Sequence, residues 1–215
     1  MERKLFTRLT RDLTTNVEIN SMLTRAGFRR SHDIAYRPAC TNCTACVPVR
    51  VPVRLFHWSR NLKRLAARNR DLRLEISNAA PTSELYDLFA RYQHARHADS
   101  DMALMGAADF AQMLEDGEAD TRLYSLRDEA GVLLASVIVD PVGDGLSAVY
   151  SFYAPDQPKR SLGTQLVLSL IEETRRERLS YVYLGYWIEA SKKMAYKARF
   201  QPLQALTPQG WDWTE

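Results

Sequence analysis

The sequence is poor in several features that would assign it to a familiar class. It has only three cysteines, an odd number that lie close together, which argues against the disulfide framework of a small secreted protein. It shows no N-terminal apolar segment of the signal-peptide type and no apolar run long enough to span a bilayer. We therefore expect a soluble, cytoplasmic protein without a membrane partner.

Signatures of common enzyme classes are also missing. The chain contains no G-x-S-x-G, no H-E-x-x-H and no P-loop, so the simplest signs of a serine hydrolase, a zinc protease or a P-loop NTPase are absent. It contains neither an internal repeat nor a low-complexity stretch. At 215 residues it is long enough to bury a sizeable core, in one large domain or two small ones.

The charge balance is only mildly basic, with a net charge of +3, and composition alone does not indicate nucleic-acid binding. The position of the charge is more informative. One basic run precedes the cysteines and another follows them, namely Arg25, Arg29 and Arg30, then Arg60, Lys63, Arg64, Arg68 and Arg70. A single run is usually a solvated face, but two runs around one cysteine loop favour a polyanionic partner.

The segment Gly27–Arg54 holds all the cysteines, at Cys40, Cys43 and Cys46. The C-x2-C-x2-C spacing lets thiolates converge in a tight turn, as zinc sites and iron–sulfur clusters require. Three thiolates do not complete a tetrahedral site, so a fourth ligand would be water, a residue outside this sequence, or one of His32, His57, His94 and His97. The alternative is three reduced, partly buried cysteines without a metal.

Apolar spacing predicts the elements of the N-terminal part. A helix is expected over Glu18–Ala26, followed by a short extended stretch over Phe28–Tyr36. Alternating valines from Val47 to Val53 predict a strand that its prolines confine to a sheet edge, with Arg50 and Arg54 facing outward. Ser59 is expected to cap a basic helix that runs to about Asn69.

The rest of the chain predicts a sheet with helices. We expect strands over Leu72–Ile76, Arg122–Arg127, Val132–Val139, Ala148–Tyr153, Tyr181–Tyr186 and Phe200–Leu206, and helices beginning at Pro81-Thr82-Ser83-Glu84 and covering Ala107–Glu115, Leu162–Arg178 and Ser191–Ala198. The turns around residues 129–131 and 143–145 suggest an antiparallel meander. This order describes an α+β sheet domain over residues 79–215, preceded by a small Cys/Arg-rich region over residues 1–78.

Several blocks resemble one protein family, in the same order along the chain. They are GFRRS, YRPACTNCTACVPVRVPV, RYQHARHADSDM, VYSFYAPDQPKRSLGTQ and YVYLGYWIEASKKMAYKARFQPL. Together they resemble the bacterial branch of the aminoacyl-tRNA–protein transferases, which are related to arginyl-tRNA–protein transferase and move leucine from leucyl-tRNA onto proteins with N-terminal Asp or Glu. Family members carry a further segment before the ERKLF stretch, with an additional cysteine near a Pro-Tyr pair, and we expect that this chain lacks it.

The resemblance implies a GNAT-like acyltransferase fold for the C-terminal part and the marking of acceptor proteins for N-degron proteolysis. The reaction would be attack of an α-amine on the ester that joins an amino acid to the tRNA 3′ end. Because the ester is already activated, no cofactor is required, and positioning can supply much of the rate. A zinc ion or an iron–sulfur cluster at the cysteine loop remains a structural option.

Recognition of an acidic N-terminal residue needs cations, and guanidinium groups pair well with carboxylates. The resemblance points first to Arg29, Arg30 and Arg37, and then to Arg96 and His97. For the RNA, basic and aromatic residues that interleave near the C-terminus suit contacts with phosphates and bases, namely Trp187, Lys192, Lys193, Lys197 and Arg199. Each of these is alternatively an ordinary surface residue.

The candidate catalytic groups are two carboxylates and two tyrosines. Asp99 or Asp101 would bind the acceptor ammonium or take its proton, and Tyr186 or Tyr196 would stabilise an oxyanion. The loop around Ser161-Leu162-Gly163-Thr164 precedes a helix, where GNAT enzymes bind the phosphates of acyl-CoA. Three alternatives stay open: an arginyl-tRNA–protein transferase, a CoA-dependent GNAT N-acyltransferase, and a non-enzymatic metal-containing RNA-binding module.

Overall fold

An eight-stranded mixed sheet runs through the computed structural model, which describes residues 4–8, 13–116 and 120–214. Its spatial order is β11-β10-β4-β9-β8-β7-β6-β5, and β8 and β9 are its parallel neighbours. The strands are β4 (Val47–Pro52), β5 (Arg73–Asn78), β6 (Arg122–Arg127), β7 (Leu133–Val142), β8 (Gly145–Tyr153), β9 (Tyr181–Trp187), β10 (Gln204–Thr207) and β11 (Gly210–Trp213).

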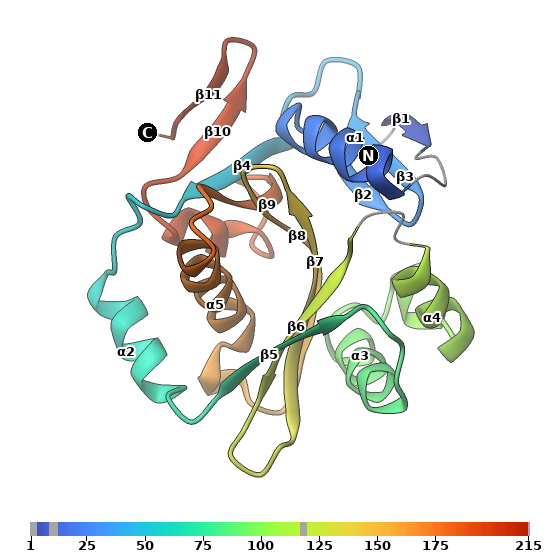
Figure 1. The fold of residues 1–215 in the computed structure, drawn as a ribbon, viewed down its shortest axis with the longest axis vertical. Helices are drawn as coiled ribbons and strands as arrows, with labels where there is room; N and C mark the ends of the chain where they lie inside the picture. The colour runs from blue at the N-terminus through green and yellow to red at the C-terminus, as the bar shows by residue number, and fades with distance from the viewer. Residues whose placement is uncertain (1–3, 9–12, 117–119, 215) are drawn as a thin grey trace.

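Helices cover both faces of this sheet (Figure 1). One face carries α5 (Leu162–Arg176) with α2 (Arg60–Arg68) packed beside it, and the other carries α3 (Ser83–Arg96) and α4 (Ala107–Glu115). Aromatic rings fill the space beneath α3 and α4, where Phe89 packs against Phe110 and Phe152. Three short 3₁₀ segments complete this part, η1 (Asp101–Leu104), η2 (Pro158–Arg160) and η3 (Ala195–Arg199).

A smaller unit precedes the large sheet. It consists of α1 (Leu13–Arg25) and a three-stranded sheet of β1 (Lys4–Arg8), β3 (Ile34–Pro38) and β2 (Arg29–Ser31) in that order. Gly27 ends α1 at a φ of 84°, a conformation that glycine adopts without strain. In Figure 1 this unit lies at the upper right, against the end of the large sheet.

Most elements that periodicity predicts are present. The α4 bounds agree with the prediction, Ser59 and Thr82 cap α2 and α3, and β6, β7 and β8 form the expected meander. The GNAT-like α+β class is confirmed. The predicted helix over residues 191–198 is a series of turns followed by η3, and β1 and β11 were not predicted. Within the described residues, no helix is both long and apolar enough to cross a bilayer.

The prediction that residues 47–54 form an edge strand is wrong. β4 lies inside the sheet, between β9 and β10. Its prolines are compatible with that place because the ladder is irregular there: the register with β9 shifts between Val49 and Arg50, and β10 pairs only with those two residues.

Arg50 was also expected to face outward, and it is buried. Its guanidinium carbon lies 3.6 Å from the Tyr181 ring centroid and 4.4 Å from that of Trp211. The same group donates hydrogen bonds to Gln204 and to the Tyr183 hydroxyl. Stacking on aromatic faces desolvates a guanidinium favourably, so this arginine joins the last hairpin to the sheet.

The predicted boundary near residue 78 falls at the end of β5. Both β4 and β5 come from the region before it, yet both are strands of the large sheet. Residues 1–78 therefore contribute structure to the sheet as well as the smaller unit.

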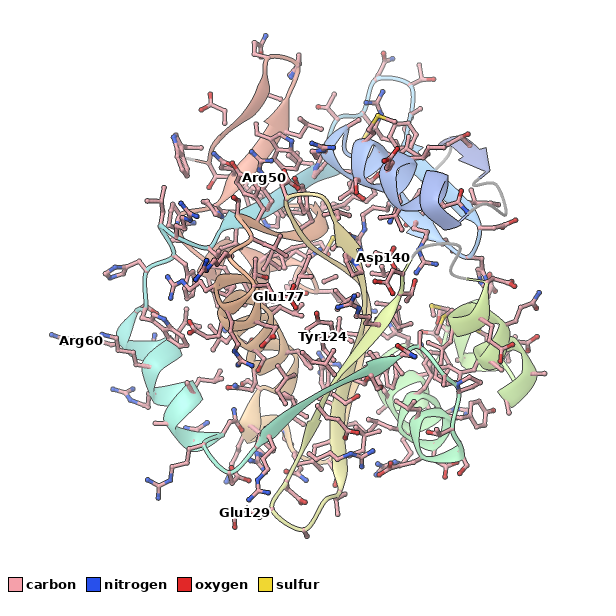
Figure 2. All side chains as sticks on the ribbon, viewed as in Figure 1. Arg50, Arg60, Tyr124, Glu129, Asp140 and Glu177 are labelled. Carbon is pink, nitrogen blue, oxygen red and sulfur yellow. The ribbon has the colours of Figure 1, made fainter. Side chains whose placement is uncertain are left out.

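A buried ion pair attaches the smaller unit to the large sheet. Arg30 Nε lies 2.6 Å from Asp140 Oδ2 on β7, and the two side chains are 3% and 1% exposed. Thr121 and Asn20 donate to the same carboxylate, and Arg30 also donates to the His32 carbonyl oxygen. Figure 2 shows Asp140 between α1 and the sheet. Every charge in this contact has a partner, as a buried pair requires.

We predict that Arg30→Ala lowers the free energy of unfolding by about 3–5 kcal/mol, because it leaves the Asp140 carboxylate buried without its cation. Urea denaturation followed by circular dichroism measures this. Arg122→Ala is the control, since it breaks the exposed pair with Asp120 and should cost about 0–1 kcal/mol. Equal small losses for both variants would contradict the assignment.

Candidate functional site

The two parallel strands of the large sheet separate along their length. β8 pairs with β9 only from Gly145 to Ser147, opposite Tyr181 to Tyr183. Beyond Ser147, β8 continues beside β7 and β9 continues beside β4. The separation leaves carbonyl groups of β8 without a strand partner, and it opens the sheet at this point.

Arg29 of β2 fills the opening. Its guanidinium donates to the Ala148 carbonyl oxygen, to the Val149 carbonyl oxygen at 2.9 Å, and to Ser147 Oγ at 3.4 Å. A Cβ atom on Gly185 would lie 2.6 Å from Arg29 Nε, and Gly185 has a φ of 72°. The side chain thus replaces the missing strand contacts, and a glycine in β9 provides its space. Burial lowers the pKa of Arg29.

A cavity of about 420 Å³, here called the inner cavity, lies between the separated strands and α5. Arg29 and Lys197 are among its lining residues. The rest of the wall is mainly apolar, with Met102, Val137, Ala148, Val149, Leu166, Val167, Leu170, Leu184 and Met194. No aspartate or glutamate is found among the described residues that line it.

A second cavity of about 540 Å³, the outer cavity, adjoins the inner one at the start of α5. Six residues line both: Tyr92, His97, Ser151, Gly163, Lys193 and Tyr196. The outer cavity adds the loop from Gln157 to Thr164 and two cationic side chains, Arg96 and Lys192. Backbone N–H groups at a helix N-terminus beside cations favour an anionic ligand such as a phosphate.

Lys197 occupies a buried place that its neighbours in the sequence do not share. It is 9% exposed, whereas Lys192, Lys193 and Arg199 are exposed. Its Nζ donates to the Tyr186 carbonyl oxygen at 2.5 Å. Burial, together with the charge of Arg29, lowers the pKa of Lys197 to about 7. At neutral pH the Lys197 side chain is therefore in equilibrium between the neutral amine and the charged ammonium form.

Two aromatic groups form the wall between the cavities. Tyr92 and Tyr153 pack with ring centroids 4.7 Å apart, and His97 Nε2 lies 3.4 Å from the Tyr92 hydroxyl. Burial lowers the pKa of His97, and the nearby charges of Lys193 and Arg96 act in the same direction. His97 is thus kept neutral at neutral pH, where it can donate or accept one hydrogen bond.

The predicted site residues divide into two groups. Those that line a cavity are Arg29, Arg96, His97, Lys192, Lys193, Tyr196 and Lys197. Those that line neither the inner nor the outer cavity are Arg30, Arg37, Asp99, Asp101, Tyr186, Trp187 and Arg199.

The second group has structural contacts or lies exposed. Arg30 is held by Asp140. Arg37 lies over the Phe28 ring at 5.3 Å. The Tyr186 hydroxyl is 2.9 Å from the Gly27 carbonyl oxygen and 3.0 Å from that of Tyr36. Burial raises the pKa of Tyr186, as it does for Tyr196. The Trp187 indole nitrogen is buried without a hydrogen-bond acceptor among the described residues.

The two candidate carboxylates lie beside the inner cavity without lining it. Asp99 and Asp101 are exposed, while their neighbours Ser100 and Met102 contribute to the wall. A role for either aspartate in catalysis stays a prediction.

The cysteine loop contains three cysteines that are not joined in disulfides, with Cys43 exposed and Cys40 and Cys46 half-buried. Burial raises the pKa of Cys46, and the neighbouring thiols add to the effect. Within the part of the chain that the structure describes, no three His, Cys, Asp or Glu side chains are grouped as a metal site. As arranged, the loop does not fit a metal ion or cluster, and no chemical step below uses one.

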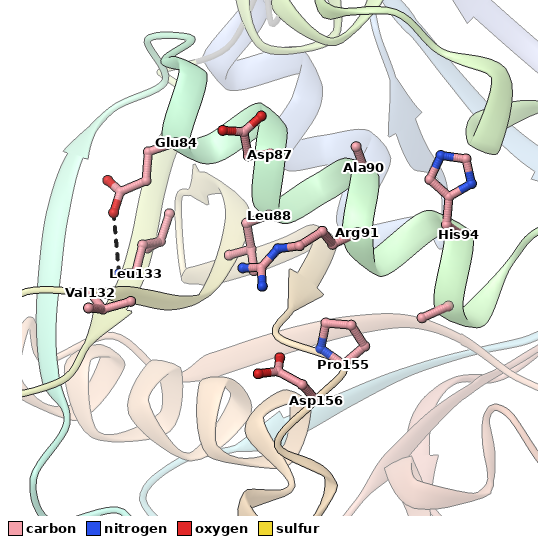
Figure 3. A pocket seen from close by; sticks show the side chains of 11 residues that line it. Glu84, Asp87, Leu88, Ala90, Arg91, His94, Val132, Leu133, Pro155 and Asp156 are labelled. Carbon is pink, nitrogen blue, oxygen red and sulfur yellow. Dashed lines mark hydrogen bonds between the residues drawn. The ribbon is translucent and has the colours of Figure 1, made fainter.

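A third concavity, of about 1,100 Å³, lies on the outer side of α3 (Figure 3). Its floor is apolar, with Leu88 and Pro155, and the Leu133 N–H donates to Glu84 across one end. Arg91 and His94 line it. Of the candidate site residues it contains only His94, considered above as a metal ligand, and it shares no lining residue with the inner cavity.

Sequence reasoning missed the apolar wall of the inner cavity and the burial of Lys197. Both lie within the motif blocks: residues 91–102 supply Met102, residues 149–165 supply Val149, and residues 181–203 supply Leu184 and Lys197. The signal was the convergence of three separate blocks, which indicates a shared site without indicating which side chains face it.

Solved structures with the same fold include the L-PGS protein of Bacillus licheniformis, with a TM-score of 0.55 and 15% identity over 75% of this chain and 59% of that chain. The C-terminal domain of a putative lysylphosphatidylglycerol synthetase from Agrobacterium fabrum gives a TM-score of 0.55 and 16% identity, covering 90% and 62%. At such identities the similarity concerns the fold alone.

Curated relatives are much closer in sequence. An aspartate/glutamate leucyltransferase of Parvibaculum lavamentivorans is 52% identical over 210 residues, which are 98% of this chain and 86% of the relative. One from Afipia carboxidovorans is 51% identical over 216 residues, covering 98% and 85%. Family models described as the N terminus and the C terminus of arginine-tRNA-protein transferase match residues 1–64 and 84–207. The chain belongs to the arginine-tRNA-protein transferase family, and to the part of it that contains the aspartate/glutamate leucyltransferases.

Proposed function

We propose that this protein transfers leucine from leucyl-tRNA to the N-terminal amino group of proteins that begin with Asp or Glu, and so marks them for N-degron proteolysis in the cytoplasm. Its relatives at about half identity are named for this activity. The partners would be a charged tRNA and an acidic N-terminus.

The character of the inner cavity supports leucine over arginine as the transferred residue. A site for an arginyl side chain would need a carboxylate, because a buried guanidinium without a partner is costly. The described lining of the inner cavity has none, and Val149, Leu166 and Leu184 offer apolar contacts instead. The guanidinium of Arg29 would further repel an arginyl group. This is the observation that carries the proposal.

The outer cavity suits the 3′ end of the tRNA. Lys192, Lys193 and Arg96 would contact phosphates, together with the N-terminus of α5. Tyr92 and Tyr196 lie where the two cavities meet, so the ester bond would be placed between an anionic nucleotide end and an apolar aminoacyl end. The same arrangement explains why a phosphate-binding loop with a single glycine, Gly163, is sufficient at this site, because side chains supply much of the positive charge.

The chemistry needs a proton acceptor and a positive field. The neutral α-amine of the acceptor attacks the ester carbonyl carbon, and Lys197 Nζ takes the proton that the new amide nitrogen loses. The C–O bond to the ribose then breaks, and the proton passes from Lys197 to the ribose oxygen. The products are an amide bond and a tRNA with a free hydroxyl group. Arg29 is fixed by three acceptors on β8, so its charge is available to the oxyanion without reorganisation.

The acceptor side chain would be held by the cations of the same site. Of the arginines first considered for this role, Arg29 is the one that lines a cavity, while Arg30 is bound to Asp140. A nearby guanidinium attracts a carboxylate even where it does not pair with it directly. We therefore assign the preference for Asp and Glu to the positive field of Arg29, with Arg96 at the rim.

The proposal predicts transfer of labelled leucine from charged tRNA to peptides that begin with Asp or Glu, and none to peptides that begin with Ala. Arginyl-tRNA should give little or no product, because the inner cavity lacks a carboxylate. Thin-layer or mass-spectrometric analysis of the peptides measures both. Arginine transfer would favour the arginyl-tRNA–protein transferase alternative, and acetyl transfer from acetyl-CoA would favour a CoA-dependent GNAT enzyme.

The role of Lys197 predicts a particular pH dependence. In the wild type, kcat/KM should fall as the pH drops through about 7, because the protonated lysine no longer accepts a proton. Lys197→Met should reduce the rate about 10²–10⁴-fold at pH 7. Its residual activity should continue to rise through about pH 8, following the acceptor amine alone. Lys193→Met, at the exposed lysine proposed to contact a phosphate, should lower kcat/KM through weaker tRNA binding but retain the shape of the wild-type pH profile. An unchanged profile in Lys197→Met would exclude this role.

A further inference from the structure

The outward face of α2 carries cations without acidic partners. Four of them are exposed and recur at steps of three and four residues, which places them on one side of the helix: Arg60, Lys63, Arg64 and Arg68. Leu62 packs into the core on the opposite side. In Figure 2, Arg60 points away from the ribbon. Among the described residues, no carboxylate lies within ion-pair distance of Arg60, Lys63 or Arg64.

The end of α2 is fixed to the loop that forms the outer cavity. Arg160 donates to both Asp71 carboxylate oxygens, with the longer contact at 2.6 Å, and to Asn69 Oδ1 at 2.9 Å. Asn69 Nδ2 in turn donates to the Arg160 carbonyl oxygen at 2.9 Å. Arg68 donates to the Lys159 carbonyl oxygen. These contacts set the position of α2 relative to the loop. The Asp71 carboxylate is paired with Arg160, so its negative charge does not neutralise the cationic face of α2.

The loop held in this way continues directly into the outer cavity. Residues 157–158 and 161–164 line that cavity, and Arg160 lies between them. The loop of residues 157–164 therefore connects the C-terminal end of α2 to the proposed entrance for the tRNA 3′ end. A ligand that enters the outer cavity past residues 157–161 would meet α2 next.

We propose that α2 docks the double-stranded acceptor stem of the donor tRNA, while the single-stranded 3′ end enters the outer cavity. This inference rests on the proposed function. The cavities measure about 540 and 420 Å³, which suits a nucleotide end and an aminoacyl group but not a duplex. Duplex RNA is recognised largely through its phosphates and its shape. The face from Arg60 to Arg68 spans about 12 Å, enough to follow several phosphates.

The test compares two donors of different size. One is leucyl-tRNA, and the other is a leucylated oligonucleotide that carries only the single-stranded 3′ end. Lys63→Glu/Arg64→Glu reverses two charges on α2. The control is Arg91→Glu, which reverses an exposed charge on α3, and α3 lies across the sheet from α2 (Figure 1). Binding of uncharged tRNA by fluorescence anisotropy at several salt concentrations is measured in parallel.

We expect the α2 variant to bind tRNA about tenfold or more weakly. In a plot of log K against log salt concentration, the slope for this variant should be shallower by about one to two. Its KM for leucyl-tRNA should rise, while its use of the short donor stays within about twofold of wild type. Arg91→Glu should match wild type with both donors. Equal losses with both donors would overturn the inference, because α2 would then act through the cavity or the fold.

Other outcomes are equally informative. A raised KM for the acceptor with unchanged tRNA binding would assign α2 to acidic proteins and overturn the inference. If the wild type transfers leucine from neither donor, the proposed function fails. The anisotropy measurement still decides the role of α2 in that case, since unchanged binding of tRNA by the charge-reversal variant contradicts it.

Discussion

The site depends on one arginine that takes the place of a strand. Where β9 leaves β8, the guanidinium of Arg29 bonds to Ser147 Oγ and to two successive carbonyl oxygens, so the opening has no unpaired acceptors at those positions. A cleft in a sheet is costly unless such groups find partners. The opening depends on this contact, and Gly185 is needed because any side chain there would occupy the same space as Arg29.

The two adjacent arginines of β2, Arg29 and Arg30, have different roles. Successive side chains of a strand point to opposite sides, so Arg29 faces the cavity while Arg30 faces Asp140. One cation is neutralised by a buried carboxylate, and it anchors the smaller unit. The other shares its surroundings with Lys197 and lacks an acidic group in the described cavity lining. Burial lowers the pKa of the lysine, and repulsion from Arg29 adds to the effect, so that Lys197 can accept a proton near neutral pH.

Local periodicity predicted the helices, the meander and the caps, because these depend on spacing within a few residues. It failed where a distant partner decides the outcome. Val47–Pro52 has the composition of an edge strand, yet a register shift opposite β9 admits it to the sheet interior. Arg50 has the pattern of a surface residue, yet Tyr181 and Trp211 enclose it. For the site, the motif blocks indicated Arg29, Arg96, His97 and Tyr196, but the apolar wall and the buried state of Lys197 emerge only when residues from β8, α5 and η3 come together.

The position of β4 has a consequence for how the chain is made. This strand leaves the ribosome early, but its partners are residues 181–187 and 204–205, near the end of the chain. Contacts between such distant segments form slowly, and an unpaired apolar strand is prone to association with other chains. During synthesis β4 therefore stays without its ladder until residues 181–205 have emerged, and the large sheet closes only then.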